Sequence, residues 1–254
     1  MPEPLYNMDY LEQTTRLLKN LKQTSYQPFA GLDSGTIADI GCGTGADALN
    51  LLKMLEGKVA ILGIDHDELM IGKAQSDANG QTGIRFETGD ATNLNLGDAS
   101  LAGIRAERLI QHIAAPEQAY AEFYRVLQPG APVVIVETDW NSITFYNGDA
   151  GTAHTLNRYL TQENVNNGLA AANVIKNLQE AGFRDINLEI FPFSSRSLDQ
   201  VVAILRIDYA LQQMQVRGHI STEVYDTFLT ALRDADQNRY FACTINLVVA
   251  SATK

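Results

Sequence analysis

The stretch Asp39-Ile40-Gly41-Cys42-Gly43-Thr44-Gly45 decides the fold of this chain. It follows a short apolar segment, 36–40, and precedes residues 46–55, in which apolar residues recur at helical spacing. Glycine permits positive φ angles, so a strand can turn sharply into a helix here, and a ligand can approach the backbone. The first N–H groups of such a helix then face a polar or anionic part of the ligand. The stretch therefore predicts a strand–turn–helix unit with a binding site at the turn.

Short apolar segments alternate with amphipathic segments on both sides of this turn. Alternation of this kind implies right-handed βαβ units, and so an α/β fold with a Rossmann-like, doubly wound, mostly parallel sheet. The continuous apolar run that ends at Asp65 is typical of a strand covered on both faces. We expect strands at 36–40, 59–64, 84–87, 101–106 and 133–136, and helices at 8–24, 46–55, 67–78 and 116–127.

The pattern changes after Glu137. Residues 138–165 are polar and aromatic without a clear period, and a helix at 168–181 and a strand at 186–193 follow. Ser197 and Gln200 suggest a capping box that starts a helix with an apolar stripe as far as Tyr209, and a second helix is expected at 221–234. The chain closes with an apolar β-type run at 240–250. Because no repeat or linker interrupts it, we expect one domain, 1–254, with lid or cap segments at 1–25, 138–165 and 197–236.

Composition excludes several classes of partner. The 254 residues include 19 Lys and Arg against 30 Asp and Glu, a formal net charge of −11, so a phosphate-binding surface for nucleic acid is not expected. No apolar run approaches the roughly 20 residues that span a membrane, and the amino terminus does not resemble a signal peptide. Two distant cysteines favour a reduced, cytoplasmic setting. The oligomeric state is left open.

A carboxylate stands at the end of the next expected strand. Asp65 lies twenty residues past Gly45, where it can accept hydrogen bonds from both hydroxyls of a ribose. A glycine turn with such an acid indicates a nucleoside cofactor, and two cofactors compete. The dinucleotide fingerprint is G-x-G-x-x-G, whereas this chain has G-x-G-x-G followed by Asp47, an acid that a pyrophosphate would meet at the helix start. The spacing and the acid at position 39 fit another cofactor better.

Residues 39–45 resemble motif I of the class I S-adenosylmethionine (SAM)-dependent methyltransferases, and other segments over about 36–140 agree. Gly89-Asp90-Ala91 resembles the family's adenine-contacting turn, and residues 107–112 and 125–130 resemble segments of the branch with ubiquinone, menaquinone and natural-product methyltransferases. The resemblance implies an antiparallel last strand at 240–250, with SAM as cofactor and its demethylated form (SAH) as product. It also implies transfer of methyl to a hydroxyl, amine or carbon of a small molecule. The chain departs from the family at Ala102-Gly103, where Phe-Asp is usual, and at Ala131-Pro132.

The resemblance also assigns roles to residues. The backbone of the glycine turn would hold the methionine end of SAM with Asp39 near its ammonium, while Asp65 would bind the ribose. Asp90 and Ala91 would contact the adenine edge. The expected cofactor-binding residues are Asp39, Gly41, Cys42, Gly43, Gly45, Asp65, His66, Asp90, Ala91 and Glu107.

His112 is the candidate general base if the acceptor is a hydroxyl. It follows the fourth expected strand, beside the methyl path, and an unperturbed histidine pKa near 6.5 suits that role. In similar enzymes a histidine here pairs with a tyrosine from the amino-terminal helix, so Tyr6 and Tyr10 are weaker candidates. No metal is expected, because the cysteines form no zinc pattern and carboxylates are not clustered. The alternatives are a SAM-binding cyclase, a nicotinamide oxidoreductase on the same scaffold, and a non-catalytic SAM-binding protein.

Overall fold

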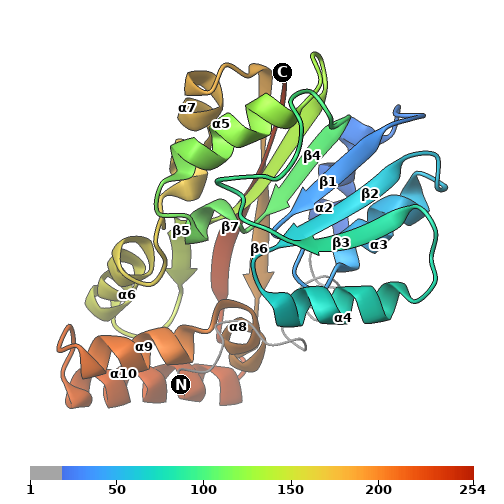
Figure 1. The fold of residues 1–254 in the computed structure, drawn as a ribbon. Coiled ribbons are helices and arrows are strands. Elements are labelled where there is room, and N and C mark those ends of the chain that lie inside the picture. Colours follow the sequence, from blue (N-terminus) through green and yellow to red (C-terminus); the bar gives the residue numbers. More distant parts are fainter. Residues whose placement is uncertain (1–18) are drawn as a thin grey trace.

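Residues 19–254, the part described in the computed structural model, contain a seven-stranded sheet in the order β3-β2-β1-β4-β5-β7-β6 (Figure 1). Strands β1 to β5 pair in parallel, and β7 lies antiparallel to both β5 and β6. The predicted Rossmann-like fold with an antiparallel last strand is confirmed. The order of the strands reverses between β1 and β4, since β2 and β3 follow β1 on one side and β4 and β5 lie on the other, and doubly wound sheets bind ligands at such a point.

The strands are β1 (Thr36–Ile40), β2 (Ala60–Asp65), β3 (Ile84–Thr88), β4 (Gly103–Glu107), β5 (Pro132–Phe145), β6 (Arg184–Ser195) and β7 (Cys243–Thr253). The α-helices are α2 (Lys19–Tyr26), α3 (Ala46–Met54), α4 (Glu68–Ala78), α5 (Pro116–Val126), α6 (Ala150–Gln162), α7 (Ala170–Glu180), α8 (Leu198–Leu205), α9 (Ile207–Val216) and α10 (Thr222–Gln237). Two short 3₁₀ turns are η1 (Gln27–Phe29) and η2 (Ile110–His112). Of the predicted helix 8–24, only the part from Lys19 onward falls within the described residues.

Helices cover both faces of the sheet, as the buried strands require. Helices α5 and α7 pack on one face through apolar residues such as Phe123 and Leu178, while α2, α3 and α4 pack on the other through residues such as Leu21 and Leu51. These side chains are at most 2% exposed. Each contributes about 1.5–3 kcal/mol by leaving water, and together they hold the strand ends that carry the site in a rigid frame.

Residues 138–165 differ from the expectation of an irregular segment. Strand β5 continues to Phe145, paired with β7 across a bulge between Asp139 and Thr144, and α6 follows. The extension was not apparent because its outward side chains meet solvent, and its inward ones, such as Trp140, meet helices instead of the central core. The single helix expected after Ser197 is two helices, because Arg206 has φ 52° and breaks the chain between α8 and α9.

Helices α6, α8, α9 and α10 form a separate layer beyond the ends of β5 and β7, which we call the end layer (Figure 1). Its core contains Leu156, Leu211 and Phe228, each at most 1% exposed. Whether the expected lid segments close over a substrate stays a prediction. Within residues 19–254, no helix has both the length and the apolar character required to cross a bilayer.

Candidate functional site

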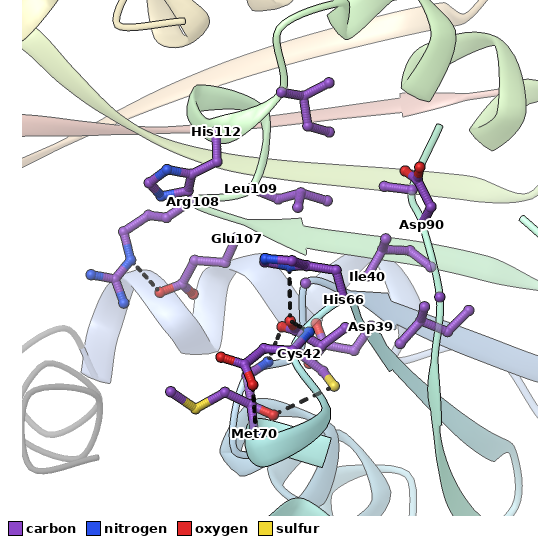
Figure 2. Close-up of a pocket in the computed structure, with 18 of the residues that line it drawn as sticks. Asp39, Ile40, Cys42, His66, Met70, Asp90, Glu107, Arg108, Leu109 and His112 are labelled. Carbon is purple, nitrogen blue, oxygen red and sulfur yellow. Dashed lines mark hydrogen bonds and ion pairs between the residues drawn. The ribbon is translucent and has the colours of Figure 1, made fainter. Parts of the chain in front are cut away.

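A cavity of about 800 Å³ opens at the carboxyl ends of β1, β2 and β4. Figure 2 shows Asp39, Asp90 and His112 pointing toward it from different strands and turns. Nearly all the site residues expected from the sequence within the described part of the chain line this cavity: Asp39, Gly41, Cys42, Gly43, Asp65, His66, Asp90, Ala91, Glu107 and His112. Gly45 does not line it. It caps the start of α3 with φ 79°.

The glycine turn folds back over the end of β2. The amides of Gly41 and Cys42 both donate to the carbonyl oxygen of Ile64, at 2.7 and 3.0 Å. Gly41 has φ 73°, and a Cβ placed there would lie 3.0 Å from Cδ1 of Leu109. Any larger residue would therefore combine backbone strain with a close contact to the η2 segment. The glycine is required by this close approach, which leaves the turn's backbone facing the cavity.

Asp65 links the end of β2 to the glycine turn. Its Oδ2 accepts a hydrogen bond from Gly43 N at 2.8 Å, and its Oδ1 accepts one from Asp67 N at 3.0 Å. A carboxylate offers about four lone-pair positions. Two are used by these amides, so the oxygens retain capacity for two further donors such as a pair of ribose hydroxyls. The neighbouring His66 has a mostly exposed ring with Nδ1 3.2 Å from Asp65 Oδ1.

Asp90 follows β3 across the cavity. Its Oδ1 accepts hydrogen bonds from both the amide and the hydroxyl of Thr92, each at 2.8 Å, and these bonds lower the pKa of Asp90. The carboxylate is thus ionised and oriented at neutral pH. Ala91 beside it is buried and presents a small apolar surface. A planar ring with a donor on its edge suits this pair of residues.

A buried cluster of charges lies at the other end of the cavity, beneath α2. The guanidinium of Arg105 pairs with Asp39 Oδ1 at 3.2 Å, with Asp47 Oδ2 at 3.4 Å, and with Glu107. Lys22 Nζ reaches Asp47 Oδ2 at 2.6 Å and Glu107 Oε1 at 3.0 Å. Asp39 and Arg105 occupy paired positions of neighbouring strands, so the register of the sheet itself creates this contact. The cluster joins α2, α3, β1 and β4.

The members of this cluster differ in ionisation. Burial opposes the charge of Asp47 and Glu107, but adjacent cations outweigh burial and lower the pKa of both acids. For Asp47 these cations are Arg105 and Lys22, and for Glu107 the cation with the largest effect is Lys22. At Asp39 burial is the larger effect and raises the pKa, although Arg105 opposes it. This end of the cavity therefore carries fixed carboxylates at the start of α3 and the end of β4.

His112 ends η2 and lines the cavity. Burial and the nearby guanidinium of Arg108 lower the pKa of His112 to about 4, in contrast to the value near 6.5 on which the general-base hypothesis relied. The imidazole is neutral at pH 7. Asn166 Nδ2 donates to the carbonyl oxygen of His112 at 2.7 Å, and Glu137 Oε1 accepts from Ile110 N at 2.7 Å, so η2 is held from two sides.

Two further expectations concern residues near this turn. Tyr6 and Tyr10 lie outside the described residues, so their role stays a prediction. The departure at Ala102-Gly103 has a packing reason, because a Cβ at Gly103 would lie 2.8 Å from Cε1 of Phe29. The aromatic ring of η1 thus fills space beside β4.

Within residues 19–254, no group of three His, Cys, Asp or Glu side chains is arranged to hold a metal ion.

Sequence reasoning missed Lys22, Arg105, Gln111 and Glu137. The available signal was a charged or amide residue inside an apolar segment, as for Arg105 between Ile104 and Ala106. Burial of a charge requires a partner. Such a residue therefore marks a buried polar contact, ionic for Lys22 and Arg105 and hydrogen-bonded for Gln111 and Glu137, but the pattern alone does not name the partner.

Comparison with known proteins agrees with this geometry. Residues 37–130 match a family model described as a methyltransferase domain. An uncharacterized 37.1 kDa protein in transposon TN4556 of Streptomyces fradiae is 29% identical over 97% of this chain and 71% of its own length. A demethylmenaquinone methyltransferase of Deinococcus radiodurans is 36% identical over 40% of this chain and 42% of its own length. The chain spans less than half of the length of the curated methyltransferases that it matches.

A solved structure shares the fold. Phosphoethanolamine N-methyltransferase 2 of Haemonchus contortus, in complex with phosphomonomethylethanolamine and S-adenosylhomocysteine, superposes with a TM-score of 0.63 at 16% identity. The match covers 99% of this chain and 59% of that one. At this identity the likeness concerns the fold alone.

Proposed function

Residues 37–130 place this chain in the class I SAM-dependent methyltransferase family, and we propose that it transfers a methyl group from SAM to a small molecule. One observation carries the proposal: the glycine turn and the Asp65 carboxylate are joined by a hydrogen bond and face one cavity. A nucleoside with an amino-acid tail can occupy both at once. The methyl acceptor is a hydroxyl, amine or carbon of a metabolite that enters beside His112.

The residues present fit SAM. All of these residues line the cavity: the backbone of residues 41–43 would hold the methionine end, Asp65 the ribose hydroxyls, and Asp90 with Ala91 the adenine edge. When bound, SAM supplies a methyl group activated on a sulfonium. The chain's part is to hold the donor carbon and the acceptor atom in line with water excluded, and positioning of this kind contributes about 7–11 kcal/mol to catalysis.

Electrostatics favour SAM over a nicotinamide dinucleotide. The first turn of α3 carries Asp47, which is ionised and largely buried, where a pyrophosphate would lie. Lys22 and Arg105, the cations beside this helix start, are already paired with Asp47 and Glu107, so they are not available to neutralise the two charges of a pyrophosphate. The cationic sulfonium and ammonium of SAM suit the carboxylates of this cavity.

Titration calorimetry tests the proposal. We expect the protein to bind SAM and SAH and not NAD. Asp65→Ala is expected to weaken SAM binding at least about tenfold, because a hydrogen bond to a charged group is worth about 1.5–3 kcal/mol. Asp77→Ala is the matched control, since Asp77 pairs with Lys73 on α4 and does not line the cavity. No measurable binding of SAM or SAH, or unchanged affinity in Asp65→Ala, would contradict the proposal.

A further inference from the structure

The side-chain amide of Gln111 lies buried beside His112, between three partners, and two of them, an indole N–H and a backbone carbonyl, have a fixed hydrogen-bonding character. Gln111 is 1% exposed. Its Oε1 lies 2.8 Å from Nε1 of Trp140, and its Nε2 lies 3.3 Å from the carbonyl oxygen of Arg108. The same Nε2 lies 3.2 Å from Nε2 of His112. The amide therefore connects Trp140 on β5 to the imidazole in the cavity wall.

The polarity of these bonds follows from chemistry. An indole N–H only donates, so the amide atom that faces Trp140 must be the oxygen. A backbone carbonyl only accepts, so the atom that faces Arg108 O must be the NH₂ group. Two independent neighbours thus give the same orientation of the amide. The NH₂ group has only donors to offer, and its second hydrogen points at His112, so Nε2 of His112 must accept.

We infer that Trp140 and Gln111 are positioning residues that hold His112 as the neutral Nδ1–H tautomer, so that His112 donates a hydrogen bond through Nδ1 and takes no proton from the methyl acceptor. The inference rests on the proposed function and deepens it. A group that approaches Nδ1 meets a donor. To take a proton at Nε2, the ring would have to break its bond to Gln111.

The two ends of this connection are anchored by other elements. The carbonyl oxygen of Trp140, at the bulge of β5, accepts from Asn157 Nδ2 of α6 at 3.1 Å. The carbonyl oxygen of Gln111 accepts from Asn167 N at 2.9 Å. The backbone that carries the indole and the backbone that carries the amide are thus held in place, and rotation of either side chain would break the bond between Trp140 and Gln111.

The charges around His112 agree with a neutral ring. Arg108, on the segment from β4, and His66, after β2, both disfavour a proton on His112, and Asp65 favours one. Glu137, on β5, faces the backbone of Ile110 and Gln111. Burial is the largest effect, and the pKa of His112 falls to about 4.

This arrangement bears on the class of acceptor. In the transfer, the acceptor's lone pair forms the new bond to the methyl carbon, and the pair of the broken C–S bond returns to sulfur. His112 takes no proton from the acceptor, so any proton that the acceptor loses passes to solvent before the acceptor is bound or after the methylated product leaves the site. Acceptors whose lone pair is available at neutral pH, such as a weakly basic amine, a carboxylate or an ionised phenol, therefore suit this site better than an alcohol.

Nitrogen NMR of the full chain with ¹⁵N-labelled histidine tests the inference directly. We expect His112 to show a protonated Nδ1 and a bare Nε2, with no titration between about pH 5.5 and 8. His219 is an internal reference with the opposite tautomer, because its Nε2 lies 3.0 Å from the carboxylate Oε2 of Glu163. A His112→Asn variant assigns the signal. A protonated Nε2, or titration of His112 above about pH 6, would overturn the inference.

Gln111→Glu tests the positioning role, because a carboxylate only accepts and so demands a proton on Nε2. We expect the tautomer to switch, the pKa of His112 to rise by about one unit or more, and kcat to fall about tenfold while SAM affinity stays within about twofold. Trp140→Phe, which removes the indole N–H, is expected to give a mixture of tautomers. Gln81→Glu, the same change at an exposed position, is the control. An unchanged tautomer in both Gln111→Glu and Trp140→Phe would overturn the inference.

The tautomer is observed without turnover. A protein that does not bind SAM would therefore contradict the proposed function, and a protonated Nε2 would contradict the inference drawn from it.

Discussion

At the scale of single residues, Glu137 illustrates a buried acid that supports the site without lining it. It is fully buried, its Oε1 accepts from Ile110 N, and Oε2 has no hydrogen-bond partner among the described residues. Burial raises the pKa of Glu137 from 4.5 to about 8. The neutral form is therefore the one that folding favours, and the stability it contributes is complete below pH 4.5 and lost as pH rises through 8.

We predict that Glu137→Gln removes this loss of stability at high pH, because the glutamine side chain keeps an acceptor for Ile110 N and does not ionise. Thermal unfolding at about pH 5, 7 and 9 measures the effect. The melting temperature of the variant should rise relative to that of the wild type as pH increases, and exceed it by about 3 °C or more at pH 9. Parallel stability curves for the two proteins would show that Glu137 does not titrate in this range.

At the scale of secondary-structure elements, Lys22 fastens α2 to the sheet. Its ammonium is nearly buried and contacts both Asp47 on α3 and Glu107 on β4. We predict that Lys22→Met lowers the free energy of unfolding at pH 7 by about 3–5 kcal/mol, because the buried carboxylates of Asp47 and Glu107 lose one of the cations that offset their burial. Urea unfolding measures the change.

Lys58→Met is the control, since Lys58 is largely exposed and its pair with Glu56 contributes little. The cost of Lys22→Met should shrink in acid. Lys22 lowers the pKa of Asp47 and Glu107, so the stability they contribute is present above their unfolded values and lost as pH falls through the folded ones. If Lys22→Met lowered the free energy of unfolding no more than Lys58→Met does, the result would contradict the role of Lys22.

At the scale of the whole molecule, the end layer has a core of its own. Phe228 of α10 is 1% exposed and meets Phe145 edge-on, with ring centroids 6.0 Å apart. None of the residues in this core lines the cavity. We predict that Phe228→Ala lowers the free energy of unfolding by about 3–5 kcal/mol and leaves SAM affinity within about twofold.

Denaturant unfolding and calorimetry measure the two quantities. Val224→Ala, on the same helix at a half-exposed position, should change neither. Weaker SAM binding in folded Phe228→Ala would contradict this prediction. It would show that the core of the end layer supports the cavity, although the two share no residue.

The sequence by itself determined the α/β fold, the turn at residues 39–45, and the acids at 65 and 90. These features depend on local rules: glycine alone accepts the turn's positive φ angles, and apolar periodicity separates strands from helices. The extension of β5 could not be predicted from the sequence, because its outward side chains meet solvent and its inward ones meet the helices of the end layer instead of the central core.

Only the tertiary structure decided which distant groups meet. Arg105 meets Asp39 across 66 positions of the chain, Lys22 meets Glu107 across 85, and Trp140 meets Gln111 across 29. Strand order and register bring these pairs together, and no local pattern encodes them. The protonation of His112 belongs to the same class, because burial and neighbours from other elements control it. A residue's type shows what it is able to do, and its folded neighbours select which of those roles it performs.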